Sequence, residues 1–320
     1  MDMKNESGFQ TKPRKKVKFD PRNLIILAMG ISLAVLGVKT SELDKALTED
    51  EEYISAEASR VFEYYGEKDV INLADPTYGD TWLAALSDVP RHEMDFDNVR
   101  LENGFKNYYI DGVKANTTGI DVSYHQGDID WETVKADGVD FAMLRLGYRG
   151  YESGQINVDE RFHEYADEAL GAGLDIGVYF YSQAVTPEEA VEEAEAVLNE
   201  IGDYEIMYPV VFDWEIVGDE SARTNVVSAD VLNECAAAFC NRIARGGHIP
   251  MVYSVKKMAL TKFDMSRLAG FDFWLAEYRD IPEYPYYFTM WQYASDGHVN
   301  GIEGEVDLNM SLVDYSEVKR

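Results

Sequence analysis

Two carboxylates stand one residue apart at the end of the apolar stretch Tyr208 to Glu215, YPVVFDWE. The run Val210–Phe212 predicts a strand buried on both faces, as in a parallel sheet covered by helices. Asp213 and Glu215 then share one face of the strand end, with Cα atoms roughly 6.5 Å apart. Two acids in a partly desolvated space push their pKa values apart, which is what acid-catalysed glycoside hydrolysis requires. A strand end that simply meets solvent would carry the same residues.

Two other predicted strands also end in an acid. Asp121 follows the apolar residues of GIDVS, and Asp307 lies in EVDLN near the end of the chain. In a barrel of parallel strands, the carboxyl ends meet at one mouth. We therefore expect Asp121, Asp213, Glu215 and Asp307 to converge there.

The elements that would position these acids alternate between strand and helix from Thr118 onward. Pro187 follows the N-capping Thr186 of one helix, and Ser228 caps another that stops at Gly246. Three strands without intervening helices follow. The pattern predicts an α/β fold, an irregular TIM-like barrel of five βα units followed by three further strands. The expected strands are TTGIDVS, DFAMLRLGY, DIGVYFYS, YPVVFDWE, PMVYS, DFWLAEY, YFTMWQYAS and EVDLNMS.

An ordered set of motifs extends from Thr118 to Val313. It comprises GIDVSYHQGDIDW, GVYFYSQAVTPEEA, PVVFDWE, FWLAEY, MWQYAS and GEVDLN. This set resembles the glycoside hydrolase family 25 lysozymes, which are N-acetylmuramidases of peptidoglycan. A single D-x-E would be weak, whereas the ordered set is highly specific. The resemblance implies the same irregular barrel and cleavage of the β-1,4 bond between N-acetylmuramic acid and N-acetylglucosamine.

The resemblance also implies roles for the four acids. Glu215 would be the general acid that protonates the glycosidic oxygen and later the base that activates water. Asp213, Asp121 and Asp307 would complete an acidic floor. An Asp nucleophile and attack by the substrate's own N-acetyl group both stay open, because side-chain rotation permits either carboxyl separation.

Side chains near the strand ends are candidates for sugar contact. We expect Tyr181, Trp274, Tyr278 and Gln292 to bind substrate, since an aromatic ring offers an apolar face and a polar tip. Core packing is the ordinary alternative for about half of the aromatic residues near the motifs. Trp214, between the two acids, should point away from them into the wall.

Composition excludes several classes of function. The formal charge of −30 argues against a nucleic-acid partner, which would require Lys and Arg to neutralise phosphates. The five histidines show no ligand spacing, so neither a metal site nor a cofactor is predicted.

Cys235 and Cys240 should be packing residues rather than a disulfide. Arg145 and Arg149 either pair with buried acids or bind a substrate carboxylate, and the sequence leaves both open.

The N-terminal region predicts an anchor. Residues 1–23 carry seven Lys or Arg against three acids and precede the apolar run Leu24–Val38, an order that keeps the N-terminus cytoplasmic. We expect a basic tail (1–23), a signal anchor or transmembrane helix (24–40), an acidic stalk or accessory segment (41–107) and the barrel (108–320). The chain would then cross the cell membrane once, with the barrel outside the cytoplasm. A run of about 22 Å also suits a cleaved signal peptide, which would make the protein secreted.

Two local expectations concern the region before the barrel. Residues 73–90 could form a short helical pair, and the Asp111-Gly112 step between β-prone runs predicts a hairpin.

Three functions compete. The first is a membrane-tethered muramidase whose partner is the peptidoglycan glycan strand. The second is a catalytically idle barrel that binds glycan, and the presence of all four acids argues against it. The third is a hydrolase of another N-acetylated polymer such as chitin, because fold alone does not fix substrate.

Overall fold

The computed structural model describes residues 70–75 and 79–318 of the 320-residue chain. Two compact units are distinguished, Met1–Ala85 and Leu86–Arg320. The predicted basic tail and membrane anchor, and the acidic segment up to residue 69, lie outside the described residues. Within the described ranges, no helix has the length and apolar character needed to cross a membrane.

The first unit contains an antiparallel hairpin of β1 (Val70–Asp75) and β2 (Gly79–Ala84). Ile71 and Leu73 are buried while Asn72 between them is only partly so. This alternation has the period of a strand. The short helical pair expected over residues 73–90 is therefore wrong, because the two-residue period decides the structure here.

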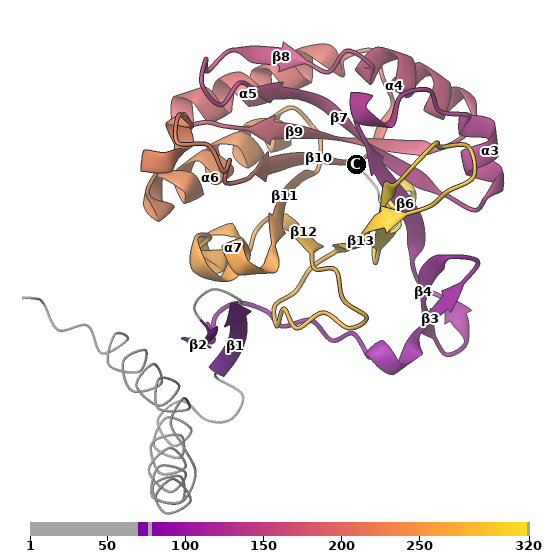
Figure 1. The fold of residues 1–320 in the computed structure, drawn as a ribbon, viewed down its shortest axis with the longest axis horizontal. Coiled ribbons are helices and arrows are strands. Elements are labelled where there is room, and N and C mark those ends of the chain that lie inside the picture. Colours follow the sequence, from indigo (N-terminus) through magenta and orange to yellow (C-terminus); the bar gives the residue numbers. More distant parts are fainter. Residues whose placement is uncertain (1–69, 76–78, 319–320) are drawn as a thin grey trace, which may run out of the picture. The chain divides into compact units, whose positions relative to one another are not determined.

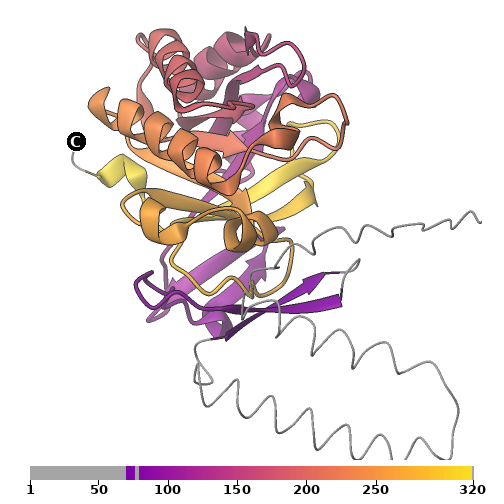
Figure 2. The ribbon, with the colours of Figure 1, turned by 90° about the vertical axis from the view of Figure 1, so that its left-hand side faces the viewer.

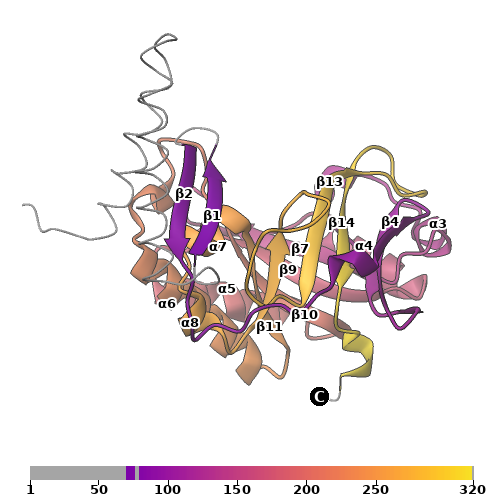
Figure 3. The same cartoon turned by 90° about the horizontal axis from the view of Figure 1, so that it is seen from below.

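A closed barrel of eight strands forms the second unit (Figure 1). Apart from β8, which is antiparallel to β7, the strands from β6 to β13 pair in parallel. β14 is antiparallel to both β13 and β6, and β6 also pairs with β7 to close the ring. Figure 3 shows β13 and β14 side by side. The predicted irregular TIM-like barrel is confirmed. The barrel strands are β6 (Thr117–Val122), β7 (Phe141–Arg149), β9 (Asp175–Ser182), β10 (Ile206–Trp214), β11 (Pro250–Val255), β12 (Asp272–Ala276), β13 (Met290–Gly297) and β14 (Val306–Ser311), with β8 (Ile156–Val158) added beside β7.

Helices follow the first five barrel strands and lie on the outer surface of that half (Figure 1, Figure 2). The caps form where the sequence placed them: Thr186 accepts from the backbone N–H of Glu189, and Ser228 from that of Val231. The α-helices are α3 (Trp131–Ala136), α4 (Phe162–Gly171), α5 (Pro187–Glu200), α6 (Ala229–Arg245), α7 (Lys256–Thr261) and α8 (Met265–Leu268). The 3₁₀ turns are η1 (Phe96–Asn98), η2 (Tyr124–Gln126), η3 (Arg223–Val226) and η4 (Tyr315–Glu317).

A small antiparallel sheet packs beside β6 and β14 through its middle strand, β4. It comprises β3 (Val99–Glu102), β4 (Phe105–Ile110) and β5 (Val113–Lys114). Asp111 and Gly112 join β4 to β5 with φ values of 52° and 80°. Two consecutive positive φ angles are typical of a tight hairpin turn, so the predicted hairpin is confirmed.

Large side chains fill the barrel interior and form its floor. Gly119 on β6 permits this packing, since a Cβ there would lie 2.2 Å from Cζ of Phe141. With the interior filled, polar side chains gather at the carboxyl ends of the strands, as in other barrels of this type. The cluster comprises Phe141, Met143, Tyr208, Val211, Met251, Tyr253, Trp274, Ala276, Met290 and Tyr315.

Candidate active site

The four acids singled out by the sequence come together at one end of the barrel. Asp121 and Asp213 lie near the carboxyl ends of β6 and β10, and Glu215 directly follows β10. Asp307 lies near the start of β14, where the antiparallel register sets it opposite Asp121. Because β14 runs against its neighbours, its beginning reaches the mouth at which parallel strands end. Charges on these residues shift one another's pKa values, which reflects their proximity.

Asp121 is buried and held by two amides. Its Oδ2 accepts hydrogen bonds from Nδ2 of Asn309 at 2.7 Å and Nε2 of Gln292 at 2.8 Å. Burial raises the pKa of Asp121 to about 6, while both amides oppose the rise. Hydrogen bonds to the charged form favour it, so this carboxylate is ionised at neutral pH.

Asp213 is equally buried but lacks such support. Its Oδ1 has no hydrogen-bond partner among the described residues. Burial raises the pKa of Asp213 well above its ordinary value, and the charges of Glu215 and Asp121 raise it further against the opposing charge of Arg145. Because buried polar atoms are ordinarily hydrogen-bonded, an unpartnered carboxyl oxygen at a barrel mouth is suited to meet a ligand.

Glu215 and Asp307 are half-buried. Burial raises the pKa of Glu215, and the Tyr253 hydroxyl opposes the rise. Burial also raises the pKa of Asp307, to about 8, together with the charges of Asp121 and Glu215. Acids this close titrate as a group, so the cluster keeps protons near neutral pH that it can donate.

Amide, hydroxyl and indole groups surround the acids. Oε1 of Gln292 accepts hydrogen bonds from the hydroxyls of Tyr253 at 3.0 Å and Tyr278 at 2.8 Å. The indole Nε1 of Trp274 donates to Oδ1 of Asn309 at 2.9 Å. Gln292 and Asn309 both donate in turn to Asp121, so this network fixes that carboxylate.

The four residues predicted to contact sugar differ in how exposed their side chains are. Trp274 and Gln292 are buried, and their polar groups already bind protein atoms. Tyr278 is 51% exposed. Tyr181 is partly buried, with its pKa raised by burial and by the charges of Glu215 and Asp213. The two tyrosines are thus the members of the predicted set with surface left for a ligand.

Two polar residues of the site were missed by sequence reasoning. Asn309 lies two residues after Asp307, and this spacing could have placed it on the same face of β14. Tyr253 lies near the end of β11, opposite Asp213 in the sheet register. Its position at a strand end was the available signal.

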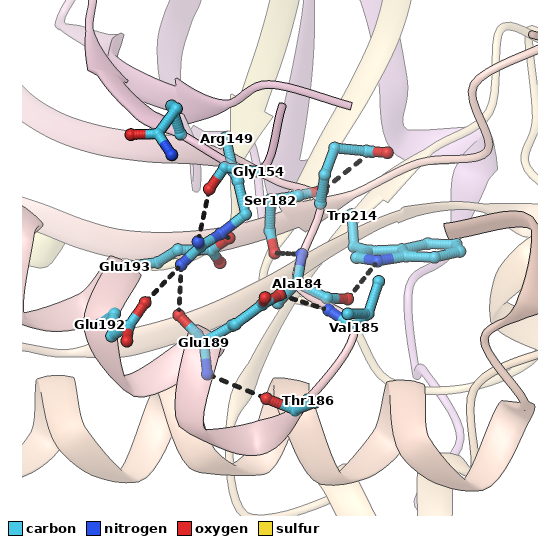
Figure 4. Close-up of polar contacts among 12 residues, drawn as sticks. Arg149, Gly154, Ser182, Ala184, Val185, Thr186, Glu189, Glu192, Glu193 and Trp214 are labelled. Atoms are coloured by element: carbon cyan, nitrogen blue, oxygen red, sulfur yellow. Dashed lines mark hydrogen bonds and ion pairs between the residues drawn. The ribbon is translucent and has the colours of Figure 1, made fainter. Parts of the chain in front are cut away.

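The structure distinguishes the two arginines. Arg149 is buried and donates from Nε to Oε1 of Glu193 at 2.7 Å and from its other nitrogens to the backbone oxygens of Gly154 and Glu189 (Figure 4). It therefore pairs with a buried acid. Arg145 pairs with Asp159 at 2.8 Å. Its positive charge also opposes the rise in the pKa of Asp213.

Trp214 points away from the two acids, as predicted. Its indole Nε1 donates to the backbone oxygen of Ala184 at 3.3 Å (Figure 4).

Cys235 and Cys240 are free and buried, which confirms that they pack rather than form a disulfide. In the part of the chain that the structure describes, no group of three or more His, Cys, Asp or Glu side chains could hold a metal ion.

The family model of the glycosyl hydrolases family 25 matches residues 120–302, which is more than half of the chain. An autolytic lysozyme of Clostridium acetobutylicum is 27% identical over 192 residues, covering 60% of this chain and 54% of that protein. Lysozyme M1 of Streptomyces globisporus is 26% identical over 205 residues, covering 61% of this chain and 67% of that protein. This chain thus matches about half the length of the clostridial relative.

One solved structure supports the fold. The modular autolysin LytC from Streptococcus pneumoniae, in complex with a synthetic peptidoglycan ligand, is similar with a TM-score of 0.55 and 22% identity. The similarity covers 76% of this chain and 56% of that one.

Proposed function

This chain belongs to the glycosyl hydrolases family 25, and from this membership we propose that it hydrolyses peptidoglycan. The bond cleaved is the β-1,4 bond between N-acetylmuramic acid and N-acetylglucosamine. The observation that carries the proposal is the cluster of four carboxyl groups at the barrel mouth, whose pKa values are all raised by burial. The lysozymes among the relatives and the peptidoglycan ligand of the LytC structure support the substrate class.

Glu215 acts as the general acid in this proposal. It is less buried than Asp121 and Asp213, so its carboxyl group is the more accessible to a bound glycan. It transfers a proton to the glycosidic oxygen as the bond from that oxygen to the sugar carbon breaks. The resulting carboxylate then takes a proton from the water that completes hydrolysis.

Asp213 assists at the sugar carbon through its unpartnered Oδ1. An ionised carboxyl oxygen there either accepts the N–H of the substrate's acetamido group, so that the acetamido oxygen attacks, or attacks the carbon directly. Both routes need Asp213 ionised while Glu215 holds a proton. The coupled titration of the cluster allows this distribution, because a proton on one acid favours the charged form of its neighbour.

Asp121 and Asp307 complete the floor of the site. The charge of Asp121, fixed by Gln292 and Asn309, would stabilise positive charge that develops on the sugar ring. The rings of Tyr181 and Tyr278 would contact the sugars at the mouth.

The decisive experiment is product analysis. The purified chain is incubated with purified peptidoglycan, the new reducing ends are reduced with borohydride, and the fragments are identified by mass spectrometry. Reduced N-acetylmuramic acid ends are expected. Reduced N-acetylglucosamine ends would contradict the proposed bond, hydrolysis of chitin alone would favour another polymer, and binding without cleavage would indicate an idle glycan-binding barrel.

We further propose that residues 24–40 anchor the chain in the cell membrane with the barrel outside the cytoplasm, because seven basic residues precede the apolar run. In whole cells, protease added outside should release the barrel while residues before Arg22 stay protected. Protection of the barrel would contradict this orientation, and a mature chain that lacks residues 1–40 would indicate secretion.

A further inference from the structure

The backbone of Glu215 lies just beyond the sheet that carries it. The last residue pairs of β10 are Trp214 with Ser182 of β9 and Asp213 with Tyr253 of β11. Strand pairing therefore stops one residue before Glu215 on the β9 side and two residues before it on the β11 side. The residue proposed to donate the proton needs some other contact to fix its position.

Gln183 supplies that contact. It directly follows β9 and is fully buried. Its side-chain Nε2 donates to the backbone oxygen of Glu215 at 3.0 Å and to that of Ser182 at 2.9 Å. Its Oε1 accepts from the hydroxyl of Thr224 at 2.9 Å. The side-chain amide thus occupies the place of the next hydrogen bond between the two strands.

The orientation of this amide is fixed by its surroundings. Nε2 faces two carbonyl oxygens, which only accept hydrogen bonds, and Oε1 faces a hydroxyl that can donate. Rotation of the amide by 180° would bring oxygen against two carbonyl oxygens. Both side-chain groups of Gln183 are therefore satisfied in one orientation only.

The segment that carries Gln183 is itself held in place. The backbone N–H of Ala184 donates to Oγ of Ser182 at 3.2 Å, and the carbonyl oxygen of Ala184 accepts from the indole of Trp214 (Figure 4). Gln183 thus connects Glu215 to a segment that is fixed by hydrogen bonds of Ser182 and Trp214.

We infer that Gln183 is a positioning residue for the general acid, setting where the Glu215 carboxyl group stands relative to Asp213. This inference rests on the proposed function of Glu215. Reacting groups are sensitive to small displacements, and a shift of about 1 Å can reduce a rate about 100-fold. Loss of the Nε2 hydrogen bond frees the Glu215 backbone at the point where strand pairing has ended.

Two variants separate positioning from general stabilisation. Gln183→Met keeps the side-chain length and removes all three hydrogen bonds of the Gln183 amide, including the one to Glu215, whereas Thr224→Val removes only the hydrogen bond to Oε1. Gln183→Met should therefore lower Tm more than Thr224→Val, and kcat is measured at a temperature well below both unfolding transitions. Gln183→Met should lower kcat about 10- to 100-fold with KM within about twofold, and Thr224→Val should lower kcat less than about threefold. Equal losses of kcat in the two variants would overturn the inference.

A third variant tests the need for a donor. In Gln183→Glu, a protonated carboxyl group can donate to the Glu215 carbonyl, whereas an ionised one cannot. The ratio of its kcat to that of the parent should therefore rise as the pH falls, while the ratio for Gln183→Met stays flat. A flat ratio for both variants would contradict a donor role.

The last measurement does not depend on catalysis. The ¹³C carboxyl signal of Glu215, assigned by its absence in Glu215→Gln, is titrated in the parent and in both matched variants. Gln183→Met should move the midpoint of this titration, because the carboxyl group changes its distance from Asp213 and Tyr253, and Thr224→Val should leave it in place. If the parent fails to cleave peptidoglycan, the proposed function fails and this titration still decides the role of Gln183. An unmoved midpoint in Gln183→Met would overturn that role.

Discussion

Two groups of acids differ in their surroundings, one at the barrel mouth and the other on α5, where that helix packs against β7 and β9. At the barrel mouth, Asp121, Asp213, Glu215 and Asp307 gather, and no ion pair found among residues 70–75 and 79–318 includes any of them. In the second, outer group, Glu193 of α5 pairs with Arg149 at the end of β7 at 2.7 Å. Glu189 pairs there with both terminal nitrogens of Arg223, at 2.6 and 2.9 Å.

The pKa values show what the arginines change. Burial raises the pKa of Glu189, but hydrogen bonds from Arg223 and from the backbone N–H of Val185 outweigh it, so the value falls below the ordinary one. Deeper burial of Glu193 raises its pKa to about 7 even beside Arg149. Asp213 is also buried but has no cation in contact with it, and its pKa is raised by burial and by the neighbouring negative charges. The outer group therefore stabilises structure, and the mouth retains protons for chemistry.

The largest effect that this comparison predicts is on Glu215→Gln. Fold and glycan binding should persist, while kcat should fall by about 10²–10⁴, because an amide cannot donate a proton of suitable acidity. The measurement is the initial rate of reducing-end release from peptidoglycan. Glu192→Gln, at the exposed rim of the outer group, is the matched control and should retain full activity. More than about a tenth of parental kcat in Glu215→Gln would place the general acid elsewhere.

The second prediction removes the cation from the outer group. Arg149→Met leaves Glu193 buried without its partner, so the free energy of unfolding should fall by about 3–5 kcal/mol, measured by denaturant titration at neutral pH. The double variant Arg149→Met with Glu193→Leu should recover most of that loss, because an apolar pair of similar volume can replace a buried ion pair. A loss below about 1 kcal/mol in the single variant would mean that the pair carries little of the structure.

Local pattern predicted the strands and the ends at which the acids lie. The apolar run before Asp213, the two-residue spacing to Glu215 and the outward direction of Trp214 all depend on neighbours in sequence. Asp307 was expected at the mouth although its strand runs in the opposite direction. Its placement was correct because the start of an antiparallel strand and the end of a parallel one meet at the same edge.

Partners distant in sequence could not be predicted in this way. Gln292 donates to Asp121 across 171 residues, and Arg149 reaches Glu193 across 44, so no local period marks either contact. The sequence left the role of Arg149 open for this reason. Gln292 was expected to bind sugar, but in the structure both of its polar groups are engaged by protein side chains. Gln292 on β13 reaches Asp121 on β6 past the intervening β14, and Glu193 lies on helix α5, so both contacts depend on the tertiary fold.

The third prediction tests whether ionisation of an acid at the barrel mouth lowers the stability of the fold. The folded-state pKa of Asp307 is about 8, above its unfolded value near 3.8. Between these values the folded state binds more protons than the unfolded state, so stability falls as the pH rises. The side chain of the variant Asp307→Asn cannot ionise. Its free energy of unfolding should therefore equal that of the parent near pH 4 and exceed it by at least about 1.4 kcal/mol at pH 8. This figure corresponds to a shift of one pKa unit, which allows for solvent screening at a half-exposed group. Stabilities of parent and variant that stay parallel from pH 4 to pH 8 would contradict this.

The smallest expected effect distinguishes Asp121 from Asp307 within the mouth. With pKa values of about 6 and about 8, Asp121 is charged at pH 7 and Asp307 holds a proton. Asp121→Asn therefore removes a negative charge that favours the protonated form of Glu215, so the basic limb of the kcat/KM profile should move down by up to about one pH unit. Asp307→Asn removes little charge at that pH and should move the limb by less than half as much. A larger movement in Asp307→Asn would reverse the assignment of charge, and a limb unmoved in both variants would mean that the two aspartates lie too far from Glu215 to influence its proton.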